Sequence, residues 1–209
     1  SSTGVTASVS GTQASALSFD VTSLAKAHSL VSHEAAGSLN SVVASGPLTL
    51  TKGDGSTVEI ATGTGSLADV VAAVNASASG VTASAVQTSP GQYRLQLTAG
   101  RTGESSEFTV DGLTGFTAMD VLAQGSDAEI TVGSDPGTAY TVRSTTNAFA
   151  NVVPGLSFTV SRLETGVTVG SAVDGSEVAG DVQELVDAAN NVLSAIATAT
   201  QWNATTKTG

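Results

Sequence analysis

Alternating apolar and polar residues recur along most of the chain and predict short β-strands. Every second residue is apolar at Leu17–Val21, Val81–Ala85 and Tyr93–Leu97, which is the period of a half-buried strand. The same alternation marks shorter stretches at Leu48–Leu50, Val58–Ile60, Phe108–Val110, Ala128–Val132, Tyr140–Val142, Leu156–Val160 and Val167–Val169. The pattern therefore predicts a chain made mainly of β-strands.

The connections between these strands carry turn sequences. Asp54-Gly55 lies between two apolar stretches, and an Asp-Gly pair in that position favours a β-hairpin. Residues 24–32 continue the first strand less regularly, and residues 116–124 are ambiguous, with one helical turn as a candidate. Short strands joined by tight turns are typical of antiparallel sheets.

One internal segment changes to a helical period. Leu67, Val70, Val71 and Val74 recur at the spacing of one helix face. Ser66 precedes them as a candidate N-cap, with Asp69 three residues later in a capping-box pattern. We expect a short helix over residues 66–76, ended by Gly80.

The C-terminal segment predicts a second, longer helix. Its apolar residues recur at alternating steps of four and three, at Val178, Val182, Leu185, Ala189, Val192 and Ile196. Asp181 with Glu184 fits a cap near its start, where acidic side chains are favourable. A heptad-like stripe of this kind needs a partner helix. We expect that partner to lie outside this sequence or on another chain, which makes Val182, Leu185, Ala189, Val192 and Ile196 a candidate helical interface.

Composition and charge narrow the possible partners. Aromatic residues make up only 4% of the chain, so the core is expected to be thin. The net charge of -11 argues against binding nucleic acid or an anionic membrane surface, because both would repel the protein. The sequence has no cysteine, and no apolar run approaches the roughly 18 residues of a membrane-spanning helix. It begins without Met or a signal peptide, so we expect a piece of a longer protein, exported without a cleaved signal.

Candidate chemical motifs do not form an active site. Gly63-x-Gly65-x-x-Ala68 resembles a dinucleotide-binding turn, but the acidic residue expected about 20 positions later is missing, so a plain glycine-rich turn is predicted. His28 and His33 are the only histidines, and their odd spacing on a strand would place them on opposite faces, as surface or edge residues without a shared metal. We expect no catalytic, cofactor or metal site, and therefore no enzyme.

Three stretches of the chain resemble the filament cap protein of bacterial flagella, the flagellar hook-associated protein 2 family. The first is residues 21–32 (VTSLAKAHSLVS) and the third combines residues 140–142 and 153–158 (VPGLSF) with residues 185–190 (LVDAAN). The second resembles the hook IN motif of flagellar axial proteins and comprises Leu67, Val70, Val71, Val74, Asn75, Gly80, Val81, Tyr93, Leu95 and Leu97. Val74 replaces the Ile for which that motif is named, and Ala189 replaces an aromatic residue that the family commonly has before Asn190.

The resemblance implies a fold class and a domain arrangement. It implies an α+β protein, mostly antiparallel β, with two head domains, one inserted in the other, followed by the start of a helical stalk domain. Residues 1–50 and 126–174 would form the first head domain. Residues 51–125 would form the inserted second head domain with the IN motif, and residues 175–209 would begin the helical leg domain.

The resemblance also implies a structural function. Such caps are homo-oligomeric plates at the distal tip of the filament, outside the cell, under which exported flagellin subunits fold and insert and which block their loss. The implied partners are further copies of the chain, flagellin and a hook-associated junction protein, with a host surface as a further candidate through adhesion.

Two alternatives stay open. The IN motif by itself does not separate the cap from its sister hook–filament junction proteins, and an exported adhesive or receptor-binding β domain fits the same composition. The full-length sequence distinguishes them, because paired helical legs at both ends indicate a cap and repeated β domains or a wall anchor indicate an adhesin.

Overall fold

The computed structural model describes residues 3–9, 15–135, 137–171, 175–199 and 205. They belong to two units, one that holds the described residues up to Gly170 and one that contains helix α2 (Gly175–Ala199). In the described part of the chain, no helix is both long enough and apolar enough to cross a membrane.

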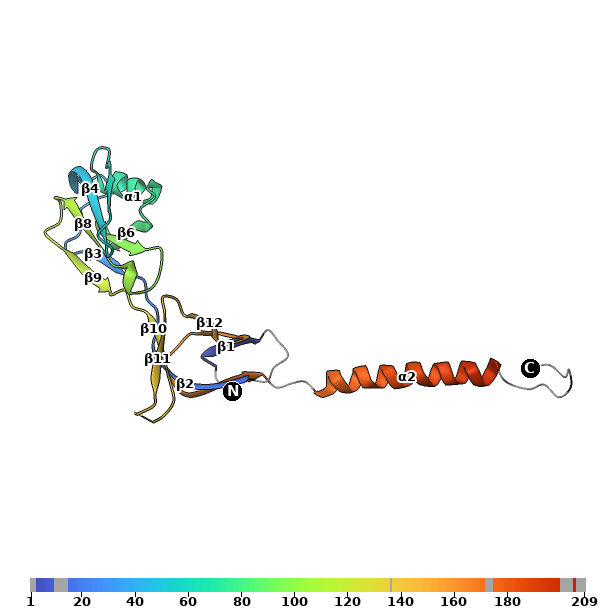
Figure 1. Cartoon of the computed structure of the whole chain (residues 1–209). Coiled ribbons are helices and arrows are strands. Elements are labelled where there is room, and N and C mark those ends of the chain that lie inside the picture. The colour runs from blue at the N-terminus through green and yellow to red at the C-terminus, as the bar shows by residue number, and fades with distance from the viewer. Residues whose placement is uncertain (1–2, 10–14, 136, 172–174, 200–204, 206–209) are drawn as a thin grey trace. The chain divides into compact units, whose positions relative to one another are not determined.

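The first unit consists of four antiparallel sheets and one short α-helix (Figure 1). The sheets have the strand orders β1-β13-β12, β11-β10-β2-β14, β6-β7-β3-β9 and β5-β4-β8. The strands are β1 (Val5–Val9), β2 (Ser15–Ser23), β3 (Ser29–Ser32), β4 (Ala44–Lys52), β5 (Thr57–Ile60), β6 (Val81–Ser89), β7 (Gln92–Ala99), β8 (Phe108–Leu113), β9 (Met119–Ala123), β10 (Ala128–Val132), β11 (Tyr140–Ser144), β12 (Ala148–Val153), β13 (Leu156–Val160) and β14 (Glu164–Ser171). Helix α1 is Leu67–Ala76 and a 3-10 turn, η1, is Glu104–Ser106. The predicted class, α+β with mostly antiparallel β, is confirmed.

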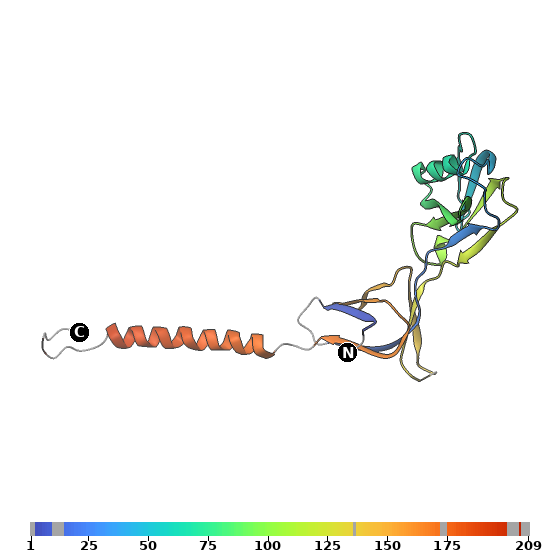
Figure 2. The ribbon, with the colours of Figure 1, turned by 180° about the vertical axis from the view of Figure 1, so that it is seen from behind.

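The buried hydrophobic residues of this unit form two separate groups. The α1 cluster draws on β3 to β8 and α1, where α1 lies beside β6 in both views (Figures 1 and 2). Its fully buried large side chains include Leu48, Leu50, Leu67, Leu95 and Leu97.

The second group, the phenylalanine cluster, draws on β2, β10 and β12 to β14. Three aromatic rings stack at its centre, with Phe19 and Phe158 at 4.7 Å and Phe149 and Phe158 at 5.3 Å between ring centroids. Phe108 and Phe116 are buried in the α1 cluster, where Leu and Val residues supply most of the other buried side chains.

The predicted hairpin and helix are confirmed in their main features. β4 and β5 pair with Leu50 opposite Val58, around the turn at Asp54-Gly55. Ser66 caps α1, because its side chain accepts a hydrogen bond of 3.2 Å from the Asp69 amide.

Other boundaries differ from the prediction. Helix α1 ends at Ala76 with Ser77 as its cap, not at Gly80, because the Ser77 amide and hydroxyl satisfy carbonyls of the last turn. Residues 24–32 are not one continued strand, since β2 ends before β3 begins. Residues 119–123 form strand β9 in place of a helical turn, because they pair with β3. Strand β12 was not predicted, because the residues Ala148–Val153 do not alternate regularly, and the register of its pairing with β13 shifts between Phe149 and Val153.

The two groups of buried residues can be compared with the predicted domain bound at residue 50, which stays a prediction. That position lies within β4, which pairs with β5 and β8 and contributes to the α1 cluster. Along the chain, Ala25 is in the phenylalanine cluster and Leu30 is already in the α1 cluster. Further along the chain, Phe116 is in the α1 cluster and Ala128 is in the phenylalanine cluster.

Candidate functional site

The apolar residues of the predicted IN motif gather inside the α1 cluster. Leu67, Val70 and Val74 project from α1, Val81 from β6, and Leu95 and Leu97 from β7, and all six are buried. Val71 and Tyr93 are partly buried against the same cluster. Gly80 takes a φ of +79° at the entry to β6, a conformation that favours glycine. The motif is therefore a packing motif that holds a helix on a sheet.

The side chain of Asn75 connects helix α1 to strand β6 by hydrogen bonds. Its side-chain amide donates a hydrogen bond of 2.9 Å to the Ala83 carbonyl, and its carbonyl oxygen accepts one of 2.8 Å from the Ala83 amide. Ala83 lies on β6, which is an edge strand of its sheet. The outward backbone groups of an edge strand need partners, and Asn75 provides both at this residue.

An equivalent contact occurs in the phenylalanine cluster. Asn147 accepts a hydrogen bond of 2.7 Å from the Ala25 amide and donates one of 3.2 Å to the Ala25 carbonyl. The sequence analysis missed this residue, because Ala25 and Asn147 are far apart in the chain and an isolated Asn gives no signal.

The glycine-rich turn before α1 is filled by the chain itself. Gly65 has a φ of +74°, and a β-carbon there would lie 1.9 Å from the Ala44 carbonyl oxygen. The amides of Leu67 and Ala68, at the start of α1, donate to the carbonyls of residues 41 and 39 at 2.9 and 3.0 Å. A dinucleotide phosphate binds to free amides at such a helix start, whereas here the backbone occupies them. The geometry fits the predicted plain turn.

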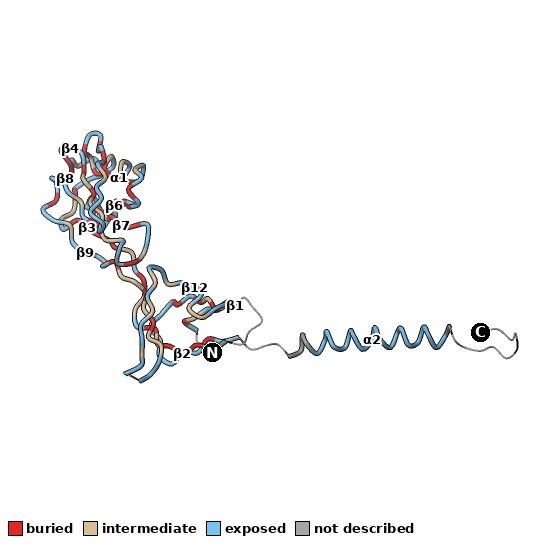
Figure 3. The backbone as a smooth tube through the Cα atoms, viewed as in Figure 1, coloured by how far each residue is buried: buried red, intermediate tan, exposed pale blue. Residues whose placement is uncertain are grey.

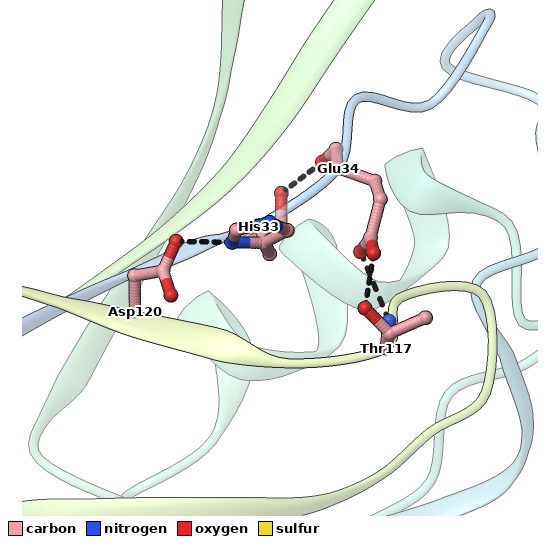
Figure 4. A network of polar contacts seen from close by, with 5 residues as sticks. His33, Glu34, Thr117 and Asp120 are labelled. Carbon is pink, nitrogen blue, oxygen red and sulfur yellow. Dashed lines mark hydrogen bonds and ion pairs between the residues drawn. The ribbon is translucent and has the colours of Figure 1, made fainter.

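The two histidines have different surroundings. His28 is buried, 4% exposed, with its ring edge-to-face against Phe108 at 5.2 Å, so the expectation of a surface or edge position is wrong for His28. His33 is exposed, and its Nδ1 lies 2.8 Å from Oδ2 of Asp120 (Figure 4). Within the described residues, no group of three or more His, Cys, Asp or Glu side chains could hold a metal ion.

A surface network next to His33 ties β3 to the segment that leads into β9 (Figure 4). The Glu34 carboxylate accepts hydrogen bonds from the hydroxyl and the amide of Thr117, the latter at 2.9 Å. These bonds, first from the hydroxyl and then from the amide, lower the pKa of Glu34 below its ordinary value. The residues are more than 80 positions apart, so the sequence carried no signal for the network.

The predicted helical interface lies on α2 and is exposed in this chain. The exposed fractions are 55% for Val182, 71% for Leu185, 59% for Val192 and 53% for Ile196, and Ala189 is exposed as well. The burial of Val178 lies outside the described residues. Figure 3 shows α2 exposed along its described length, in contrast to the strands of the first unit. The role of this stripe as an interface stays a prediction.

Comparison with known proteins begins with a family model. Residues 47–101 match the family described as "Flagellin hook IN motif", a stretch that contains all the IN-motif residues identified in the sequence. The comparison with sequences of curated proteins gives no match.

Solved structures give the wider likeness. The D2–D3 domains of the flagellar cap protein FliD from Escherichia coli match with a TM-score of 0.70 and 23% identity, over 82% of this chain and 96% of theirs. The chain has the fold of flagellar cap proteins. The D1–D2–D3 domains of the same cap protein match with a TM-score of 0.72 and 23% identity, over 95% of this chain and 72% of theirs. FliD (HAP2) from Pseudomonas aeruginosa matches with a TM-score of 0.69 and 21% identity, over 99% of both chains.

The flagellar cap fold confirms the resemblance seen in the sequence. The IN motif and the cap fold are identified by independent comparisons, one of sequence and one of structure. The matching structures are flagellar cap proteins.

Proposed function

We propose that this chain is the head part of a flagellar cap that sits at the distal tip of the filament, outside the cell. There it promotes the folding and insertion of exported flagellin subunits and blocks their loss. The observation that carries the proposal is the match to the E. coli cap domains, which extends over 96% of their length. The IN motif at residues 47–101 supports it independently.

The exposed stripe on α2 supports an assembly role. Residues 175–209 would begin a helical leg, and the match that includes a D1 domain covers a larger share of this chain than the match without it, 95% against 82%. Burying a large aliphatic side chain stabilises an assembly by about 1.5–3 kcal/mol. Helices of the same protein or of a second copy would cover Val182, Leu185, Ala189, Val192 and Ile196. The other proposed partners are flagellin and a hook-associated junction protein.

A sister hook–filament junction protein is the second candidate. The matching family model is described by its hook IN motif and does not name the cap. Junction proteins and caps occupy opposite ends of the filament, so position in the filament separates the two functions.

The test uses the full-length protein in the bacterium that encodes it. Deletion of the gene should abolish filaments and release flagellin monomers into the medium, and gold-labelled antibody against residues 1–171 should mark filament tips in the parent. Label at the junction of hook and filament would instead assign the junction role. Unchanged filaments in the deletion strain would refute both, and loss of host-cell binding in that strain would then favour an adhesin.

The deletion strain also tests the stripe. Complementation with the Leu185→Asp variant should fail to restore filaments, whereas the Ser194→Asp variant, which adds the same charge at an exposed position of α2 outside the stripe, should restore them. Equal restoration by both variants would show that the stripe is not needed for assembly.

A further inference from the structure

The chain passes between its two hydrophobic clusters through a narrow crossing. Lys26 and Ser126 form an isolated antiparallel bridge there, with N···O distances of 2.9 and 3.2 Å. In the described residues, the buried hydrophobic side chains of the two clusters form separate groups. Apolar packing between the two clusters therefore does not fix the conformation of the chain at the crossing.

Polar contacts from one segment surround this crossing. The segment Thr102–Ser106, here called the brace, follows β7 and ends in the turn η1. Its first residue, Thr102, donates a hydroxyl hydrogen bond of 2.7 Å to the Thr145 carbonyl. Its Glu104 amide donates one of 2.9 Å to the Asp127 carboxylate. Thr145 and Asp127 both lie beyond the crossing, next to strands of the phenylalanine cluster.

The brace also contacts residues 26–28, which connect β2 to β3. The Gly103 amide donates a hydrogen bond of 3.1 Å to the Lys26 carbonyl. The Ser106 hydroxyl oxygen accepts one of 3.1 Å from the His28 amide. One five-residue segment thus bonds to three separate parts of the chain, namely residues 26–28, Asp127 and Thr145.

Two glycines allow this close approach. Gly103 has a φ of +106°, and a β-carbon there would lie 2.9 Å from Oδ1 of Asp127. A β-carbon at Gly125 would lie 2.7 Å from the Gly103 carbonyl oxygen. Contacts under 3 Å require the neighbouring atoms to move, so side chains at these positions would push the brace from the crossing.

We propose that the brace is a polar lock that keeps the two clusters of the head in one orientation, and that they swing about the crossing when it is released. A joint made of hydrogen bonds opens at a lower free energy than a packed apolar interface, because water can replace each partner. The Asp127 carboxylate is the central acceptor, and its removal leaves the Glu104 amide without that partner. The inference concerns the chain's own conformation and does not depend on the proposed cap function.

The test measures a distance across the joint by double electron–electron resonance. The chain has no native cysteine, so Glu59→Cys on β5 and Thr141→Cys on β11, both at exposed positions, carry the only two spin labels. The background variants are Asp127→Ala, Thr102→Val and the pair combined. Asp111→Ala, an exposed aspartate on β8 away from the joint, is the matched control.

The parent and the control should each give a narrow distance distribution with one maximum. The Asp127→Ala variant should broaden it, and the combined variant should lose the single maximum while circular dichroism of the sheets stays that of the parent. Thr102→Val removes only the hydroxyl that donates to the Thr145 carbonyl. If Asp127→Ala fails to fold, the Thr102→Val variant tests the proposal in its place. The proposal is overturned by a parent distribution that is already broad, by unchanged distributions in the brace variants, or by equal broadening in the control.

Discussion

Removal of the Asn75 side chain tests whether the IN motif is a structural motif. Asn75→Ala abolishes both hydrogen bonds between α1 and the Ala83 backbone, at 2.9 and 2.8 Å. It leaves the buried apolar residues of the motif unchanged. The substitution therefore isolates the polar part of the motif from its packing part.

The expected decrease in the free energy of unfolding follows from the loss of these two hydrogen bonds. A typical intramolecular hydrogen bond contributes about 0.5–1.5 kcal/mol net, so two of them give about 1–3 kcal/mol. Ala83 is buried, but Asn75 is exposed and β6 is an edge strand, so removal of the Asn75 side chain lets water reach the freed groups of Ala83. The loss is therefore expected in the lower half of that range. Alanine also has a higher helix propensity than asparagine, and this offsets part of the lost hydrogen-bond energy. We expect a net destabilisation of about 1 kcal/mol.

The assay combines urea denaturation with amide hydrogen exchange. The Asn75→Ala variant should unfold at a lower urea midpoint than the parent, and the Ala83 amide should lose its protection while the amides that β6 donates to β7 keep theirs. Asn40→Ala, at an exposed turn residue, is the control. The reasoning is refuted if the two variants share one midpoint, or if Ala83 exchanges in Asn75→Ala as it does in the parent.

Three further predictions concern separate parts of the molecule. Gly65→Ala should destabilise the α1 cluster by about 3 kcal/mol or more in thermal unfolding, because it adds strain at a positive φ and sets a β-carbon against Ala44. The pKa of Glu34 is lower in the folded state than in the unfolded state. Its hydrogen bonds to Thr117 therefore stabilise the fold at pH values above the unfolded-state pKa, and this stabilisation is lost as the pH falls through the folded-state pKa. Thr117→Val should raise the Glu34 pKa toward its ordinary value in a carboxyl NMR titration. Leu185→Asp should abolish any self-association of the chain in ultracentrifugation, an association that should rise with salt because the net charge is -11.

Each of these predictions has a matched control. Gly37→Ala adds a β-carbon with open space around it, and an equal loss of stability in both glycine variants would contradict the steric argument. Thr114→Val removes a hydroxyl near the same segment, and an identical Glu34 titration in both threonine variants would contradict the assigned cause. Association of the Leu185→Asp variant at the level of the parent would exclude the stripe as the contact.

Local patterns in the sequence determined the secondary structure of much of this protein. Alternation at Val81–Ala85 and Tyr93–Leu97 predicted β6 and β7, and the cap at Ser66 predicted the start of α1. The IN-motif residues were also identified in advance, since a helix face followed by two alternating strands is a local signal. These features depend on neighbours within about 30 residues, and the periodicity of the side chains records them directly.

Contacts between distant segments were decided only by the tertiary structure. β9 is a strand because it pairs with β3, although its own sequence fits a helical turn equally well. The change of core between Ala25 and Leu30 is not marked by a turn sequence, and the irregular pattern of residues 24–32 does not show which core each residue joins. The partners of Asn147, Asp127 and Thr117 lie 23 to 122 residues away, and a polar side chain does not show in the sequence which distant backbone group it will meet. The periodicity of apolar residues shows which face of a helix or strand is buried. It does not show which other helix or strand packs against that face, because this depends on the pairing of segments that are distant in the sequence.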